Sequence, residues 1–195
     1  MKNEEATYKT TTSLIEIARN QFTEHGYHNV SLEAIAEESN VTRGAVYHHF
    51  KSKKGLFTAV LEDVQKDVAE QIMLEASKSD EPWQQLILGC TGFIKGATAK
   101  ENRRILLVDA PAVLGWDVWR KYDRENSMNV LKKHIDNLKE QNYLQKGIDV
   151  ELMTFSISGA LNELALAYSE NDSLNEESPF LGIISLLVSG FKACR

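Results

Sequence analysis

Three side chains that can bind nucleic acid lie close together in the sequence: Arg43, Tyr47 and His48. A guanidinium can donate two hydrogen bonds to guanine O6 and N7, a contact worth about 1–3 kcal/mol of discrimination against the wrong base. Tyr47 and His48 follow Arg43 by four and five positions, which places them near the same face of a helix. These residue types in this spacing predict contacts with the base edges or phosphates of DNA.

Further hydrogen-bond donors flank these residues. Thr42 and Gly44 open the same helix, His49 lies near its end, and Lys53 begins the next helix, where it can hold a phosphate. The first turn of a helix has free backbone N–H groups that suit a phosphate. A glycine in that turn lets the backbone approach DNA closely, although Gly44 can also be no more than a poor helix former.

The charge pattern around these residues also favours a polyanionic partner. No Asp or Glu occurs over residues 39–61, although the chain has 28 acidic residues and a net charge of −6. The same window contains Arg43, Lys51, Lys53 and Lys54. DNA would meet cations and donors there without a repelling carboxylate. A solvated basic face is the plain alternative.

Two short helices joined by a tight turn must position these side chains. Ser31 can cap the first helix, Asn40 tolerates the left-handed conformation of a sharp exit, and Thr42 can cap the second. Ala36 is small where the two helices cross, and Val46 faces back towards the first helix. The pattern predicts a helix-turn-helix, and it also fits an ordinary helical hairpin with no nucleic-acid role.

A wider pattern resembles the TetR family of bacterial transcriptional regulators. It covers roughly residues 10–60, and the run Tyr-His-His-Phe-x-Ser-Lys, followed by Leu56 and Phe57, is typical of that family. The resemblance implies DNA contacts from eight residues: Ser31, Thr42, Arg43, Gly44, Tyr47, His48, His49 and Lys53. Arg43 stands where lysine is also common in the family, which leaves base contact and phosphate contact both open.

The rest of the chain predicts an all-α fold. The chain of 195 residues has only three prolines, and its apolar residues recur at helical rather than alternating spacing. We expect a helix-turn-helix DNA-binding domain over residues 1–55 and a C-terminal helical regulatory and dimerisation domain over residues 56–195. The helices are expected at residues 10–25, 31–38 and 42–49, from 52 to beyond 71, and at residues 82–99, 101–109, 115–142, 149–169 and 178–194.

Composition argues against several other classes of protein. The acidic, polar first residues predict no secretory signal, and the apolar stretch at residues 181–191 is far shorter than the ~20 residues that span a bilayer. Cys90 and Cys194 are too few for a metal site or a disulfide framework. We expect a cytoplasmic protein with no membrane association, no metal and no cofactor. A redox role for Cys90 stays open.

The C-terminal helices contain residues that can line a ligand pocket. Phe93, Trp116, Trp119 and Tyr122 can form an apolar cavity, although aromatic residues at helical spacing are more often plain core. Glycines 89, 92 and 96 allow close helix packing or leave room for a small molecule. The resemblance implies an inducer pocket in this domain. We therefore expect a small-molecule effector that is apolar or aromatic.

The last two expected helices predict the oligomeric state. Residues 149–169 and 178–194 present more apolar surface than one facing helix can cover, although a fully internal pair is the alternative. In the TetR family this region forms the homodimer. Such a dimer would place two DNA readers about 34 Å apart, on successive major grooves of a palindromic site.

An enzymatic function lacks support in the sequence. His48 and His49 are adjacent, so their rings diverge on a helix and cannot chelate one metal there. No nucleophile elbow, phosphate loop or dinucleotide fingerprint occurs. We expect a homodimeric, ligand-responsive repressor of a double-stranded DNA operator. The alternative is a helical sensor or carrier with a vestigial DNA-binding module, whose affinity for duplex DNA would not fall steeply with salt.

Overall fold

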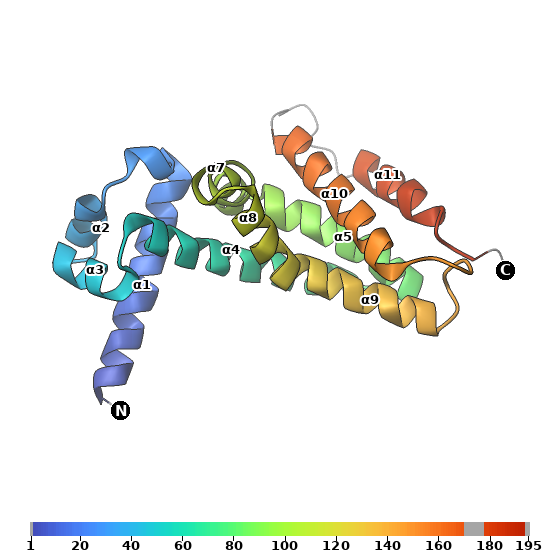
Figure 1. Ribbon diagram of the computed structural model, residues 1–195, viewed down its shortest axis with the longest axis horizontal. Helices are drawn as coiled ribbons and strands as arrows, with labels where there is room; N and C mark the ends of the chain where they lie inside the picture. The colour runs from blue at the N-terminus through green and yellow to red at the C-terminus, as the bar shows by residue number, and fades with distance from the viewer. Residues whose placement is uncertain (1, 170–177, 194–195) are drawn as a thin grey trace. The chain divides into compact units, whose positions relative to one another are not determined.

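The computed structural model describes residues 2–169 and 178–193 (Figure 1). Within these ranges every regular element is a helix, and one isolated antiparallel bridge joins Leu144 to Lys192. The all-α prediction is therefore confirmed, while Cys194 lies outside the described residues. The chain forms two compact units, the first from Met1–Val64 and Lys100–Trp119 and the second from Gln65–Ala99 and Arg120–Arg195.

The first unit surrounds a core built mainly on its long N-terminal helix. Its elements are α1 (Lys2–His25), the short η1 (Tyr27–Asn29), α2 (Leu32–Glu38), α3 (Arg43–Phe50), the first half of α4 (Lys53–Ala76), α6 (Lys100–Arg103), the π-helix η2 (Arg104–Asp109), α7 (Ala110–Leu114) and the start of α8 (Trp116–Asp123). Leu14, Ala18 and Phe22 step by four along α1 and are fully buried. Gly26, at φ 79°, follows α1, as expected.

The turn between α2 and α3 follows the predicted helix-turn-helix. The Ser31 Oγ accepts a hydrogen bond from the backbone N–H of Ala34 at 3.0 Å, and the Thr42 Oγ1 accepts one from Ala45 at 3.1 Å. Asn40 adopts the left-handed conformation, with φ 54°. Both caps and the turn are therefore confirmed.

The end of α3 differs from ordinary helix termination. Lys51, rather than a glycine, takes the left-handed conformation there, with φ 64°. Its backbone N–H returns to the Tyr47 carbonyl at 2.8 Å, and its Nζ donates to the His48 carbonyl at 2.7 Å. These two bonds satisfy carbonyls that the helix end leaves open.

The segment that begins at α6 stays helical through Pro111, although residues 110–114 lie between two of the expected helices. Pro111 lies in the first turn of α7, where its missing N–H is tolerated. The π-helix η2 directly before it already departs from regular i to i−4 bonding. The proline therefore follows the π-helical turn without breaking the helical run.

The second unit packs around α5. Its elements are the second half of α4, α5 (Pro82–Thr98), the end of α8, the π-helix η3 (Arg124–Met128), α9 (Asn129–Glu140), α10 (Val150–Ser169) and α11 (Ser178–Ser189). Helix α5 packs against α9, α10 and α11 (Figure 1). The expected single helix over residues 115–142 is in fact interrupted by η3. The last helix ends at Ser189, earlier than expected, and the Gln145 N–H then bonds the Phe191 carbonyl at 3.0 Å.

Two glycines of α5 allow its close approach to α4. A Cβ on Gly92 would lie 2.7 Å from the backbone oxygen of Gln71 and 2.9 Å from the Cα of Ile72. A Cβ on Gly96 would lie 3.2 Å from the Cα of Val68. At Gly89 the nearest atom, a methyl carbon of Ile72, would be an ordinary contact at 3.6 Å. Close packing is thus confirmed at positions 92 and 96.

We predict that Gly92→Ala destabilises the protein by about 2 kcal/mol, because the new methyl group meets backbone atoms that cannot move alone. The matched control is Gly89→Ala, which makes no short contact and gains roughly 0.5–1 kcal/mol of helix propensity. Urea unfolding followed by circular dichroism measures both. Equal stability of the two variants would contradict the close packing at Gly92.

Candidate nucleic-acid interface and ligand cavity

Helix α3 presents its polar side chains together on one exposed surface of the first unit. Thr42, Arg43, Gly44, Tyr47 and His48 are all exposed. Tyr47 stands out, because 59% of this large side chain is accessible. The cap at Thr42 leaves the N–H groups of the first turn near Arg43 and Gly44 without helical partners. This surface offers donors and a cation to an anionic partner.

The remaining three predicted DNA-contacting residues have structural partners. His49 is half-buried, and its Nδ1 lies 3.2 Å from the Thr11 Oγ1 on α1. Ser31 is exposed, but its hydroxyl caps α2. The Nζ of Lys53 lies 4.3 Å from the centre of the Tyr27 ring. Burial lowers the pKa of Lys53, and the Asp109 carboxylate opposes that shift.

One contact of Arg43 was not foreseen. Its guanidinium lies 2.8 Å from the Glu33 carboxylate on α2, and both side chains are largely exposed. Glu33 precedes the acid-free window of the sequence, so counting charges within that window missed it. Only the folded helix-turn-helix brings two residues ten positions apart into contact. The predicted base reader is therefore paired with a carboxylate of its own chain.

Val46 and an aromatic cluster contribute to the core of the first unit. Val46 is fully buried on the inner face of α3. The rings of Phe22 and Phe57 lie 5.3 Å apart edge to face, and Tyr27 lies 5.0 Å from Phe57. These ring contacts join α1, η1 and α4. Because α3 has only eight residues, the burial of Val46 rather than helix propensity holds it in place.

Polar contacts fasten residues 100–109 to the N-terminal helices within the first unit. Arg104 donates to the Glu24 carbonyl at 3.0 Å, and a Cβ on Gly26 would lie 2.9 Å from that guanidinium. The Asp109 carboxylate accepts the Tyr27 N–H at 2.8 Å. The partners lie about 80 positions apart in the chain, so no local signal could have revealed these bonds. They connect η2 directly to the elements that carry the reader.

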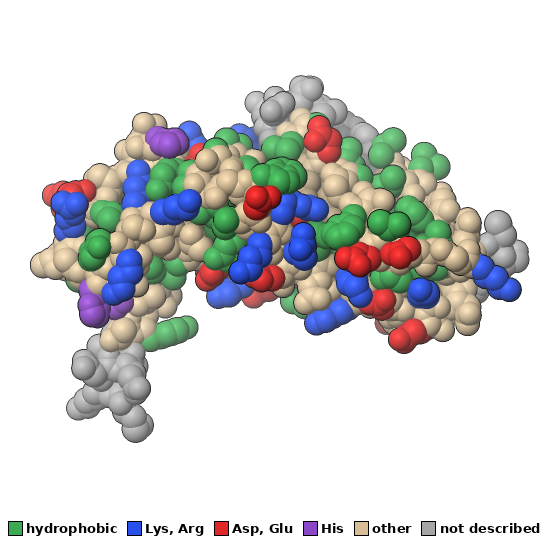
Figure 2. All heavy atoms as spheres, viewed as in Figure 1, with side chains coloured by type: hydrophobic (Ala, Val, Ile, Leu, Met, Phe, Trp, Pro, Cys, Tyr) green, Lys and Arg blue, Asp and Glu red, His purple; other side chains and the backbone are tan. Residues whose placement is uncertain are grey.

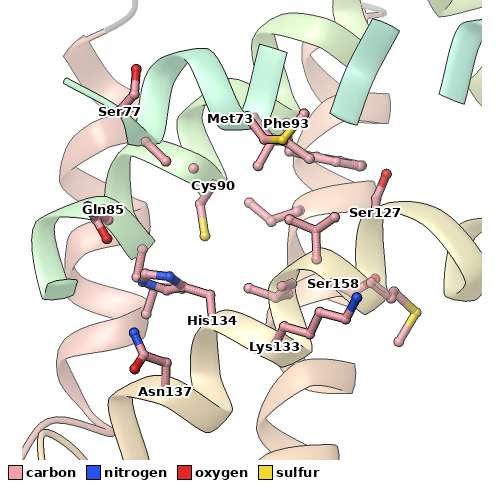
Figure 3. Close-up of a pocket in the computed structure, with 18 of the residues that line it drawn as sticks. Met73, Ser77, Gln85, Cys90, Phe93, Ser127, Lys133, His134, Asn137 and Ser158 are labelled. Atoms are coloured by element: carbon pink, nitrogen blue, oxygen red, sulfur yellow. The ribbon is translucent and has the colours of Figure 1, made fainter. Parts of the chain in front are cut away.

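The second unit contains a cavity of about 510 Å³. Nineteen residues line it, and Figure 3 labels ten of them, with Cys90, Phe93 and His134 around the cavity. Its walls are mainly apolar and come from α4, α5, α9 and α10, with η3 between them. The volume lies within the range of pockets that bind small molecules.

The four predicted ligand contacts do not come together. Phe93 lines the cavity, whereas the other three do not belong to its lining. Trp116 and Trp119 lie against each other in the first unit, with 4.9 Å between ring centres and the ring planes tilted by 45°. Trp119 is buried and donates its Nε1–H to the Leu106 carbonyl at 3.0 Å, while 63% of Trp116 is exposed. Tyr122 is half-buried.

Sequence reasoning missed the polar part of the cavity lining. Asp123, at the end of α8, is only 3% exposed, and Ser127 and Ser158 are also buried. Burial raises the pKa of Asp123, while Arg120, 2.6 Å from its Oδ2, opposes that shift. A single acid within an apolar helical pattern carries no local signal that separates it from a surface residue.

Complete burial raises the pKa of the Cys90 thiol to about 12, so the thiol stays protonated near neutral pH.

Among the described residues, no group of three or more His, Cys, Asp or Glu side chains is arranged to hold a metal ion. No helix in the described parts of the chain is both long and apolar enough to cross a membrane.

Two protein-family models match the chain. Residues 14–60 match the bacterial regulatory proteins of the tetR family, and residues 83–190 match the tetracyclin repressor-like C-terminal domain. The chain belongs to the TetR family. Its members are transcriptional regulators rather than enzymes. It is accordingly a ligand-responsive, DNA-binding transcriptional regulator, and the predicted family is confirmed.

Individual family members resemble the chain over most or part of its length. The crystal structure of a TetR-family transcriptional regulator from Pectobacterium atrosepticum is 30% identical, covers 97% of both chains and superimposes with a TM-score of 0.80. The transposon Tn10 TetC protein of Escherichia coli is 26% identical over 188 residues, 93% of this chain and 90% of TetC. The regulator AcrR of Shigella flexneri is 28% identical over 107 residues, 54% of this chain and 50% of AcrR.

The ion pair between Glu33 and Arg43 yields a prediction. Glu33→Gln should tighten binding to every duplex by about twofold to fivefold, the range expected for releasing one exposed ion pair. Fluorescence anisotropy at low salt measures this affinity.

The matched control is Glu62→Gln, which removes the same charge from an exposed position of α4. Its affinity should change less than that of Glu33→Gln. Unchanged or weaker DNA binding by Glu33→Gln would show that Glu33 does not compete with DNA for Arg43.

Proposed function

We propose that the protein is a homodimeric repressor whose α3 helices read a palindromic operator and which a small molecule releases. The observation that carries this proposal is the exposed face of α3, where Arg43, Tyr47 and His48 stand beside the open N–H groups of the first turn. In this proposal Arg43, Tyr47 and His48 contact base edges. Thr42, His49 and Lys53 hold phosphates, with Ser31 and Gly44 close to the backbone.

The division of labour within the chain is part of the proposal. Residues 1–55 act as the DNA-binding domain, and residues 56–195 act in regulation and dimerisation. We place the effector in the cavity of the second unit, with Phe93 as one contact. The roles of Trp116, Trp119 and Tyr122 in ligand binding stay predictions. We also propose a cytoplasmic location and no enzymatic activity, in keeping with the family.

Release requires that the effector binds the DNA-free arrangement more tightly than the DNA-bound one. Helix α4 is the element that we propose to move. It is continuous from Lys53, beside the reader, to Ala76, and its residues Ile72, Met73 and Ala76 line the cavity. A shift of this helix on ligand binding would change the spacing of the two readers in a dimer.

Exposed apolar side chains on α10 and α11 support the dimer. Figure 2 shows hydrophobic side chains over these helices on the face in view. Among the side chains of these helices that the structure describes, the exposed large apolar ones are Leu152, Phe155, Ile183, Leu186 and Leu187. A Cβ on Gly159 or Gly182 would meet no other atom within 4 Å, so a second helix could approach both positions closely. Two helices from each subunit would form a four-helix interface.

The base-reading role of Arg43 can be tested on duplexes selected from random sequence. Arg43→Ala should weaken the affinity for the preferred duplex by about tenfold to a hundredfold. It should also relax the sequence preference at one base pair, as expected for a lost bidentate contact. The control is Arg124→Ala, an exposed arginine of the second unit. An Arg43→Ala protein with unchanged affinity and preference would refute the assignment.

The dimer can be tested in the same preparation. Leu186 is 71% exposed on α11, and Leu186→Glu should convert the dimer to a monomer, because two glutamates would meet in the interface. Leu74→Glu is the matched control, since Leu74 is 58% exposed on α4. Sedimentation velocity at micromolar concentration measures the mass. A monomeric unmodified protein, or a dimer that survives Leu186→Glu, would rule out this interface.

A further inference from the structure

One buried carboxylate in the cavity of the second unit has an oxygen that accepts no hydrogen bond from the described residues. Asp123 lines the cavity and is 3% exposed. All of its hydrogen bonds end on Oδ2, from Arg120 at 2.6 Å and from Ser158 and Asn162 at 3.4 Å. No donor among the described residues reaches Oδ1.

The open oxygen faces space rather than packed atoms. Every fully buried side-chain nitrogen or oxygen of the described residues has a hydrogen-bond partner. Oδ1 has none, so it is not fully enclosed by protein atoms. Since Asp123 is almost wholly shielded from the outer surface yet lines the cavity, the space that Oδ1 faces is the cavity.

The neighbouring hydroxyl groups are acceptors as well. Ser127 donates its hydrogen to the Gln65 Oε1 at 3.3 Å, and Ser158 donates its hydrogen to Asp123. Each hydroxyl oxygen keeps lone pairs that can still accept. Ser127 follows Asp123 by four positions, about one turn along the same helical run. Asp123 Oδ1 and the oxygens of Ser127 and Ser158 are therefore three hydrogen-bond acceptors in the cavity lining.

The rest of the cavity suits an apolar body. Its apolar lining residues are Ile72, Met73, Ala76, Leu86, Phe93, Met128, Val130, Leu131 and Leu161. Figure 3 places Met73 and Phe93 on one wall and Lys133 and His134 on the opposite side. Lys133 is exposed, so water screens its charge, whereas the carboxylate of Asp123 is shielded from water.

We propose that the effector is a lipophilic amine, whose ammonium group binds Asp123 Oδ1, Ser127 and Ser158 while its apolar body fills the cavity. An ammonium group has three donors and no acceptor, which matches three acceptors. A carboxylate, phosphate or ketone has only acceptors and would meet oxygen lone pairs there. Arg120 keeps its hydrogen bond to Oδ2, and the bound amine supplies the hydrogen bond that the buried Oδ1 lacks.

This inference rests on the proposed function, because it assigns the ligand class of the proposed effector site. Binding can still be measured without DNA. Three compounds with the same body test it by titration calorimetry: 2-(1-naphthyl)ethylamine, 2-(1-naphthyl)ethanol and 1-naphthylacetate. The unmodified protein should bind the amine at least about tenfold more tightly than the carboxylate, the difference expected for one charge-assisted hydrogen bond.

Asp123→Asn should remove this preference and weaken binding of the amine by about tenfold, while it changes the affinity for the alcohol much less. The matched control is Asp136→Asn, because Asp136 pairs with Lys132 at 2.8 Å on α9 and does not line the cavity. If Asp123→Asn does not fold, Ser127→Ala keeps the carboxylate, removes one acceptor and should weaken the amine several-fold.

Three outcomes would overturn the inference. The carboxylate could bind more tightly than the amine, or no compound could bind. The amine could also bind with an affinity that neither Asp123→Asn nor Ser127→Ala weakens. Release of operator DNA is measured separately. If only the carboxylate releases DNA, the proposed function stands and the amine class is wrong. If the amine binds at Asp123 and leaves the DNA complex intact, the ligand class stands and the proposed release is wrong.

Discussion

Burial of one apolar stripe along α4 is the interaction on which both compact units depend. Leu56 and Val60 are fully buried in the first unit, and Val68 is fully buried in the second. The stripe steps by four, so successive members lie about one helical turn apart. In the second unit α4 packs closely enough on α5 that only glycine fits at position 92. The same helix thus supports the reader and forms part of the cavity wall.

The reader itself is a short element held by its surroundings. Eight residues of α3 would not form a stable helix alone, but the Thr42 cap and the buried Val46 fix both its start and its inner face. The outer face is then left to polar side chains. Its arginine is paired with Glu33 at 2.8 Å, so under the proposed function DNA binding would exchange one anionic partner of Arg43 for another. Such an exchange would favour selectivity over maximal affinity.

The sequence predicted the helix-turn-helix well because its signals are local: a capping hydroxyl, an asparagine in the turn, and apolar positions one turn apart. It predicted the cavity poorly. Of four expected aromatic contacts, only Phe93 lines the cavity, since Trp119 uses its indole N–H to anchor a π-helical carbonyl. Asp123 becomes a site residue only through burial, which depends on packing between helices distant in the sequence. The bonds of Arg104 and Asp109 to the N-terminal helices depend on the same kind of distant packing.

The central claim is that the exposed face of α3 reads DNA sequence as one half of a symmetric reader. Selection of bound duplexes from a random-sequence pool, at a salt concentration that suppresses non-specific binding, tests this claim most directly. Our account predicts enrichment of an inverted repeat whose half-sites are about one helical turn apart, or a multiple of it. Enrichment of no sequence, or of a single asymmetric half-site, would contradict it.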